Sequence, residues 1–169
     1  MYVVVSGLPG SGKTTLATPL GEALGLPLLA RDSIKESLWD ALGAGDLAWS
    51  RRLGAASAET FWRLATEMRA AVLDNFFHRA FAHRLEALDG PVVEVHCSCP
   101  APIALERYQS RQRHPCHFDL SYGVDMFDQW SRTDSGPLAL GGPLLEVDTT
   151  TPVVVADIAT WVRSATSCP

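Results

Sequence analysis

The feature that most constrains this chain is an eight-residue run near its beginning, Gly7-Leu8-Pro9-Gly10-Ser11-Gly12-Lys13-Thr14. The run fits the pattern G-x-x-x-x-G-K-[ST] in full, follows the apolar stretch Tyr2–Val5 and precedes a helical pattern. Glycines permit backbone conformations that other residues avoid, so successive N–H groups can surround an anionic oxygen. The run therefore predicts a loop between a strand and a helix that binds the phosphates of a nucleoside triphosphate.

Each residue type in this loop has an expected role. Lys13 should bridge the β- and γ-phosphates and take part in catalysis, and the Thr14 hydroxyl should hold Mg²⁺. ATP is the expected nucleotide, with GTP left open as the donor. A glycine-rich turn matched by chance is the alternative, which the strand before the run and the helix after it make improbable. The residues expected to bind the nucleotide here are Gly7, Pro9, Gly10, Ser11, Gly12, Lys13, Thr14 and Thr15.

Short apolar runs alternate with helical patterns along the chain. Such runs, rich in Val and Leu, are typical of buried parallel strands, and strand–helix alternation predicts an α/β fold with helices on both faces of the sheet. Helical patterns are expected over 53–68, 77–90 and 100–112, and in a last helix with Thr151 as N-cap and Pro152 at its first position. Pro19 falls within the first helix and should cost it a hydrogen bond. The five predicted strands are Tyr2–Val5, Pro27–Leu29, Ala70–Leu73, Val92–Val95 and Leu144–Val147.

Length and charge narrow the classes of protein. The 169 residues suit one domain, expected to span 1–169. A formal net charge of -5 and the lack of a basic stripe argue against long nucleic acids as partners. The absence of any run of eighteen apolar residues excludes a transmembrane helix, and the opening residues lack the pattern of a signal peptide. A cytoplasmic location without membrane association is therefore expected, and the oligomeric state is left open.

Two acidic residues follow predicted strands. Asp32 comes directly after the second strand, and the capping-box spacing of Ser33 and Glu36 predicts that the helix starts at Ser33. A carboxylate at this sheet edge can take a proton from an attacking hydroxyl; the alternative is that Asp32 is the helix cap. Asp74 ends the third strand and is expected to orient Mg²⁺ together with Thr14, with a turn residue as the alternative. Asn75 is a weaker candidate for substrate contact.

Together these motifs resemble the small P-loop kinases, in particular the polynucleotide-kinase-like and chloramphenicol-phosphotransferase-like branch. The residues that carry the resemblance are Gly7–Thr15, Arg31-Asp32 and Val72-Leu73-Asp74-Asn75, and as an order of elements it covers most of the chain. An AAA-type ATPase assignment is also expected for such a chain. The resemblance implies the P-loop NTPase fold with strand order 2-3-1-4-5, ATP and Mg²⁺ as cofactors, and Asp32 as general base.

The resemblance also implies a lid, expected at about 107–142. Arg107 and Arg111 are four residues apart on the predicted helix 100–112, and Arg113 follows. In the kinases that this sequence resembles, arginines here close over the phosphates and offset transition-state charge. Arg107 and Arg111 are therefore expected in catalysis and Arg113 in nucleotide binding. A solvated helix face is the alternative.

Histidines and cysteines form a second group. Their spacing is not a standard zinc pattern, so buried cysteines and lid histidines are favoured over a structural zinc site. His117 and Asp119 are a further candidate acid/base pair. The group consists of His96, Cys97, Cys99, His114, Cys116 and His117.

The acceptor is less constrained. The segment of about 42–68 is expected to be helical and to hold it, with Arg51 and Arg52 as possible phosphate ligands or as ordinary surface charges. Trp39, Trp49, Trp62 and Trp130 are expected either in an acceptor pocket or in the core. The favoured interpretation is a kinase that phosphorylates a hydroxyl of a small molecule: a nucleoside, a sugar or an antibiotic-like compound. A 5′-hydroxyl polynucleotide kinase and a partner-regulated P-loop ATPase are the alternatives.

Overall fold

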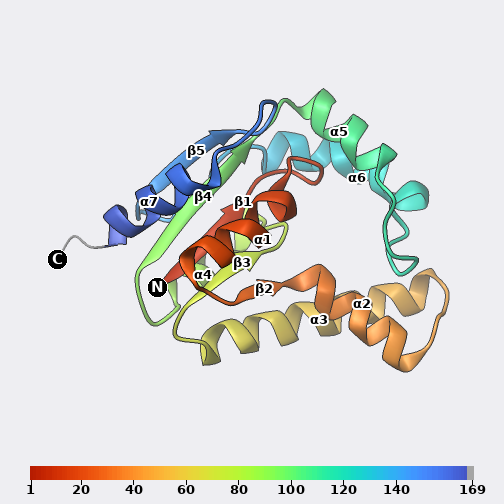
Figure 1. Ribbon diagram of the computed structural model, residues 1–169. Helices are drawn as coiled ribbons and strands as arrows, with labels where there is room; N and C mark the ends of the chain where they lie inside the picture. Colours follow the sequence, from red (N-terminus) through yellow and green to blue (C-terminus); the bar gives the residue numbers. More distant parts are fainter. Residues whose placement is uncertain (167–169) are drawn as a thin grey trace.

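The chain folds around a five-stranded parallel sheet with the order β2-β3-β1-β4-β5, which confirms the predicted topology (Figure 1). The computed structural model describes residues 1–166, without the side chains of 119–125. Each predicted strand is present and every boundary lies within three residues of the predicted one, but β5, predicted to be buried, has exposed and half-buried side chains. The strands are β1 Tyr2–Ser6, β2 Leu28–Ala30, β3 Ala71–Asp74, β4 Val92–Ser98 and β5 Leu144–Asp148.

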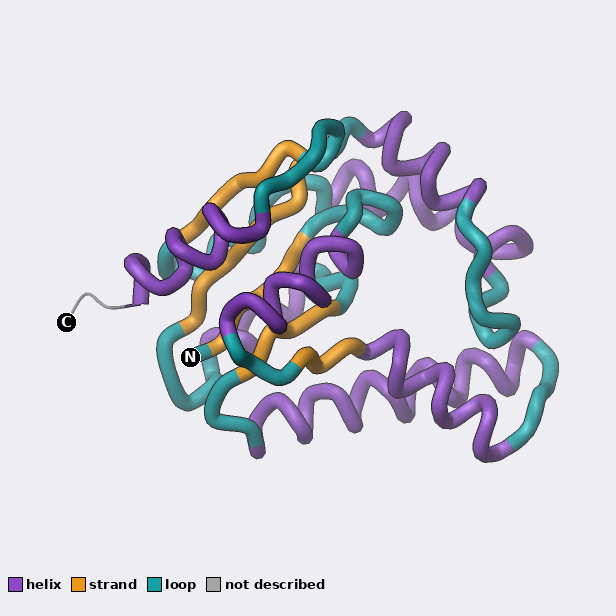
Figure 2. Tube along the Cα trace, viewed as in Figure 1, coloured by secondary structure: helices purple, strands orange, loops and turns teal. Residues whose placement is uncertain are grey.

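Helices cover both faces of the sheet (Figure 2). Because successive side chains of a strand point to opposite faces, Val3 and Val5 pack beneath α1 and α7, whereas Tyr2 and Val4 pack beneath α3. No helix in the described part of the chain is long and apolar enough to cross a bilayer. The helices are α1 Lys13–Leu24, α2 Arg31–Leu42, α3 Leu47–Glu67, α4 Ala82–Glu86, α5 Ala101–Ser110, α6 Asp119–Thr133 and α7 Val155–Thr166, with a 3₁₀ turn, η1, at Arg79–Phe81.

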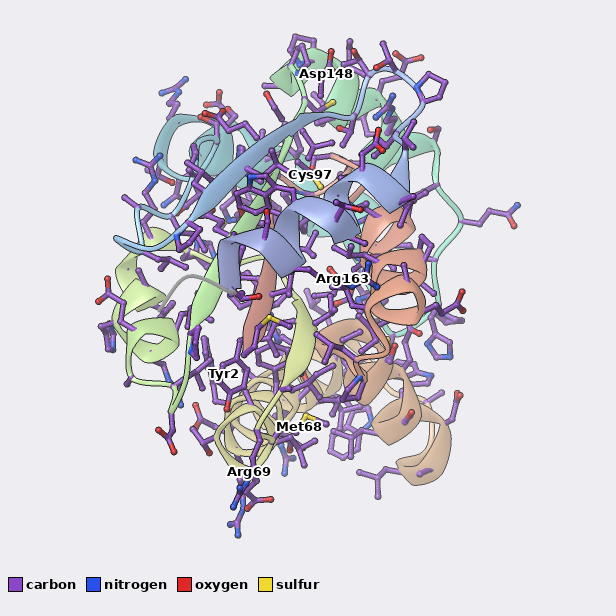
Figure 3. All side chains as sticks on the ribbon, turned by 60° about the vertical axis from the view of Figure 1, so that its left-hand side comes forward. Tyr2, Met68, Arg69, Cys97, Asp148 and Arg163 are labelled. Atoms are coloured by element: carbon purple, nitrogen blue, oxygen red, sulfur yellow. The ribbon has the colours of Figure 1, made fainter. Side chains whose placement is uncertain are left out.

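The amino and carboxyl ends of the parallel strands differ in the contacts they make. At the amino ends of the strands, the Tyr2 hydroxyl of β1 donates to the carbonyl of Met68, which follows α3. Arg163 of α7 donates to the carbonyl of Ala23 in α1 at 2.5 Å. These hydrogen bonds hold neighbouring elements together (Figure 3). At the carboxyl edge Asp74 lies in register with Val5 and with Ala30. The loop after β1, the loop after β3 and the first turn of α2 therefore meet at one place.

Several predicted helix boundaries were wrong. The second helix begins at Arg31 and not at Ser33, because β2 runs into α2 with Ala30 in extended conformation. The last helix begins at Val155 and not at Pro152, which agrees with the low helix propensity of the β-branched Val153 and Val154. The pattern over 77–90 produces only η1 and α4, and Phe81 from that predicted apolar face is exposed.

The expected acceptor segment and the expected lid both contain regular structure. The segment 42–68 is mainly the long helix α3, and the Asp46 side chain caps it by accepting the N–H of Trp49 at 2.8 Å. The segment 112–142, which makes up most of the expected lid, contains α6. Helix α5 ends at Ser110, so Arg111 follows the helix. The prediction that Arg111 shares a helical face with Arg107 was therefore wrong.

Candidate active site

The loop between β1 and α1 has the backbone of an anion site. Gly10 has a φ of +83°, and a Cβ there would lie 2.1 Å from the carbonyl oxygen of Ala104, so only glycine fits. Gly12 caps α1 without a side-chain hydrogen bond, which leaves the first N–H groups of the helix directed at the loop. The buried Ser11 Oγ has no hydrogen-bond partner among the described atoms, although buried hydroxyls normally have one. These features fit the phosphates of a nucleotide, with Gly7 and Pro9 on the same loop and Thr15 in the first turn of α1.

Lys13 lies across this loop. Its Nζ donates to the carbonyl of Leu8 at 2.8 Å, and its side chain is almost fully buried. Burial lowers the pKa of Lys13 to about 8, an effect that the carboxylates of Asp74 and Asp32 partly offset. A buried cation of this kind is stabilised by an anion that reaches the loop.

Thr14 and Asp74 form a pair that fits a Mg²⁺ ion. The Thr14 hydroxyl donates to Oδ2 of Asp74 at 2.6 Å, across the gap between the start of α1 and the end of β3. Burial raises the pKa of Asp74, while the hydrogen bond from Thr14 and the charge of Lys13 oppose that rise. A hydroxyl and a carboxylate beside a phosphate loop are the hard oxygen ligands that Mg²⁺ prefers.

A cavity of about 520 Å³ extends from this loop toward α7. Arg107 and Arg111 line it from one side, and the segment Thr149–Val155 lines it from the other. Arg107 Nη1 donates to the Thr149 carbonyl at 3.1 Å, and the Thr149 hydroxyl donates to the Ser11 carbonyl at 2.7 Å. Sequence reasoning missed this segment because Thr151 and Pro152 were interpreted as a helix start. The usable signal was its position after the last strand, at the carboxyl edge where ligands collect.

The predicted catalytic and metal-binding residues other than Arg107 line a smaller cavity of about 220 Å³. Asp32 stands in the first turn of α2 and forms an ion pair with Arg113, so it is not the helix cap. Arg107 lines only the larger cavity, whereas Arg111 lines both cavities, with its guanidinium 4.6 Å from the centre of the Tyr108 ring. The residues predicted from sequence that line the small cavity are Pro9, Lys13, Thr14, Asp32, Asp74, Asn75, Arg111 and Arg113.

His78 is a cavity residue that sequence reasoning missed. Its Nδ1 lies 3.1 Å from Oδ2 of Asp134, which also accepts from the Thr133 hydroxyl and whose Oδ1 accepts the Arg79 N–H. Although burial disfavours the charged form, the hydrogen bonds from Thr133 and Arg79 lower the pKa of Asp134. The carboxylate therefore fixes the loop after β3. The spacing of apolar residues around position 78 predicts a helix and does not mark His78 as a cavity residue.

The histidines and cysteines are dispersed. Among the described residues, no three His, Cys, Asp or Glu side chains are grouped to hold a metal ion. His96 is buried in the core beside Ser6 Oγ at 2.8 Å, and burial raises the pKa of Cys97 to about 12.

Cys99 follows β4, with its Sγ 3.8 Å from Arg107 Nη1, and the other three members of the group lie near α2. Cys116 is buried, and burial raises its pKa to about 11. His114 Nε2 lies 3.1 Å from Asp40 Oδ1, and His117 Nε2 lies 2.9 Å from Glu36 Oε1. The suggested pairing of His117 with Asp119 lies outside the described side chains.

A third cavity of about 390 Å³ lies between α2 and α3 and shares Arg31, Asp32, Tyr108 and Trp130 with the small cavity. Arg51 lines it, whereas Arg52 is exposed, with its guanidinium 5.2 Å from the Trp49 ring. Trp39 and Trp62 are buried in the core, so of the four tryptophans considered, Trp130 lines the cavities. This is the position at which an acceptor was expected.

Comparison with known proteins agrees with this geometry. The family model described as an AAA domain matches residues 3–124. A provisionally assigned kinase from Chloroflexus aurantiacus j-10-fl is 34% identical, has a TM-score of 0.84 and is covered over 97% of each chain. No curated protein matches this sequence.

More distant solved structures share the fold alone. A sugar kinase from Janibacter sp. HTCC2649 is 18% identical with a TM-score of 0.65, over 99% of this chain and 98% of that chain. A shikimate kinase from Acinetobacter baumannii in complex with shikimate is 16% identical with a TM-score of 0.59, over 96% of this chain and 90% of that chain. The resemblance to small P-loop kinases is thereby confirmed.

Proposed function

Since this chain belongs to the AAA-domain family and has the fold of the small P-loop kinases, we propose that it is an ATP-dependent phosphotransferase that acts on a small hydroxyl compound. One observation carries this proposal. Lys13, Asp32 and Asp74 line one small cavity, and that cavity shares Arg31, Asp32, Tyr108 and Trp130 with a second, larger one. A donor site adjoining an acceptor site through a carboxylate is the arrangement that phosphoryl transfer to a hydroxyl requires.

The donor side of the site binds ATP. The loop N–H groups and Lys13 bind the phosphates, Thr14 and Asp74 hold Mg²⁺, and Arg107 and Arg111 neutralise phosphate charge. Mg²⁺, when bound, offsets the negative charge that the transferring group and the leaving ADP share. The Thr149–Val155 segment contacts the remainder of the nucleotide.

Asp32 serves the acceptor side as general base. The acceptor oxygen forms a bond to the γ-phosphorus, the bond from that phosphorus to the β–γ bridging oxygen breaks, and Asp32 accepts the hydroxyl proton. The ion pair with Arg113 holds the Asp32 carboxylate in position at the cavity. Arg113 belongs to the segment after α5, so the same contact draws that segment over the cavity.

A small acceptor is preferred over the two alternatives. A cavity of about 390 Å³ is in the size range of small-molecule sites, and a formal net charge of -5 disfavours a long nucleic acid. The sugar kinase and the shikimate kinase that share this fold are named for small hydroxyl compounds. A partner-regulated ATPase would have no use for a second cavity next to Asp32.

The test is ADP release from Mg·ATP against nucleosides, nucleoside monophosphates, sugars, hydroxy acids, hydroxylated antibiotics and a 5′-hydroxyl oligonucleotide. Wild type is compared with Asp32→Asn and with the control Asp40→Asn, which changes another carboxylate of α2 that contacts the same segment through His114. We expect Asp32→Asn to lower kcat by about 100-fold or more with ATP affinity unchanged, and Asp40→Asn to retain activity. Acceptor-dependent turnover that survives in Asp32→Asn would remove Asp32 from this role.

A further inference from the structure

The acceptor cavity has two cations on one wall. Arg31 and Lys35 are four residues apart on α2, so they lie on the same side of that helix, and both line the cavity. Ser50 and Gly54 of α3 line the opposite wall. Asp32, the proposed base, is the neighbour of Arg31 in the first turn.

The hydrogen-bond partners of both cations are uncharged. Arg31 Nη2 donates to the Gly54 carbonyl at 2.9 Å, and Lys35 Nζ donates to Ser50 Oγ at 2.9 Å. Within the described part of the chain, neither side chain forms an ion pair with a carboxylate, and the neighbouring Asp32 pairs with Arg113. The buried Nε of Arg31 has no hydrogen-bond partner among the described atoms.

These two charges are also partly removed from water. Burial lowers the pKa of Arg31 and of Lys35, because it destabilises the charged form of each side chain. Cations in such surroundings are normally paired with an anion. A positive wall of this kind contrasts with the negative net charge of the chain and lies next to the proposed base.

We propose that the acceptor carries an oxyanion, a carboxylate or a phosphate, which binds between Arg31 and Lys35; this inference rests on the proposed kinase function. Arg31 has an N–H fork with an Nε edge still unpaired, which suits two oxygens of one anion, and Lys35 adds a point charge. The hydroxyl of the same molecule then points to Asp32. Its body contacts Leu47, Phe118 and Trp130, so the substrate class is a compact hydroxy acid or phosphorylated alcohol.

Binding tests the site without an identified acceptor. The protein is first saturated with Mg²⁺ and a non-hydrolysable ATP analogue, so that the phosphate loop is filled, and then titrated calorimetrically with inorganic phosphate and separately with malonate. We expect Lys35→Gln and Arg31→Gln to weaken binding of at least one probe by about tenfold or more. Arg52→Gln, the same charge change on a residue that does not line the cavity, should bind as wild type does. Absent binding in wild type, or equal binding in Lys35→Gln, would overturn the proposal.

Turnover separates this proposal from the kinase assignment and identifies the anion. ADP formation is compared for glycerol, glycerate and glycerol 3-phosphate, and for glucose, gluconate and glucose 6-phosphate. We expect the carboxylate or phosphate member of a set to be preferred, Lys35→Gln to raise its KM, and Lys35→Arg to restore it. Preference for the neutral members with an unchanged KM in Lys35→Gln defeats the oxyanion site and leaves the kinase standing. Phosphate binding that depends on Lys35, without turnover of any acceptor, supports the site and defeats the kinase.

Discussion

At the scale of single residues, Lys13 is the side chain whose charge state matters most. Its folded pKa of about 8 lies below the ordinary value of 10.5, because the ammonium group is buried. Between these two pH values the unfolded chain binds more protons than the ligand-free folded chain, so the contribution of Lys13 to the free energy of unfolding rises with pH.

This sign gives a direct prediction for Lys13→Met. In the ligand-free protein, the free energy of unfolding of wild type relative to Lys13→Met should rise from pH 8 to pH 10, by about 1.4 kcal/mol per unit at most. Urea denaturation at several pH values measures it. A difference that stays constant over this range would show that folding does not lower the pKa of Lys13.

At the scale of elements, the phosphate loop depends on contact with α5. A Cβ at Gly10 would meet the carbonyl of Ala104, whereas a Cβ at Gly25, which also has a positive φ, would meet nothing within 4 Å. Gly10→Ala must therefore displace the loop or α5, in addition to the strain that both substitutions share.

We expect Gly10→Ala to weaken ATP binding by tenfold or more, and Gly25→Ala to leave it unchanged while lowering the free energy of unfolding by about 1–2 kcal/mol. Calorimetric titration and urea denaturation of both variants check this. Equal loss of ATP affinity in the two variants would show that general strain, and not the α5 contact, is responsible.

The parts that could be predicted from sequence are those that short-range chemistry determines. The phosphate loop, the positions of the five strands and Asp74 at the end of β3 follow from residue type and spacing alone, although β5 is exposed where a buried strand was predicted. The start of α2 does not, because the continuity of β2 and α2 overrides the capping-box pattern of Ser33 and Glu36. His78 could not be found, since its place depends on Asp134, which is distant in sequence.

At the scale of the whole molecule, the candidate site lies between α5 with the segment that follows it and the hairpin of α2 and α3. The segment 111–118 runs from α5 to the hairpin of α2 and α3 (Figure 2), where Arg113 pairs with Asp32 and the Cys116 carbonyl accepts from Ser50 at 2.6 Å. Through these contacts the nucleotide side and the acceptor side are joined across the cavities.

The measurement that tests the central claim most directly is transfer of the labelled γ-phosphoryl group of ATP to an acceptor in the panel above. We predict that label appears in an organic product in proportion to ADP, with wild type and with Asp40→Asn but not with Asp32→Asn. Label released only as inorganic phosphate, at a rate that no acceptor changes, would contradict the kinase assignment and favour a P-loop ATPase.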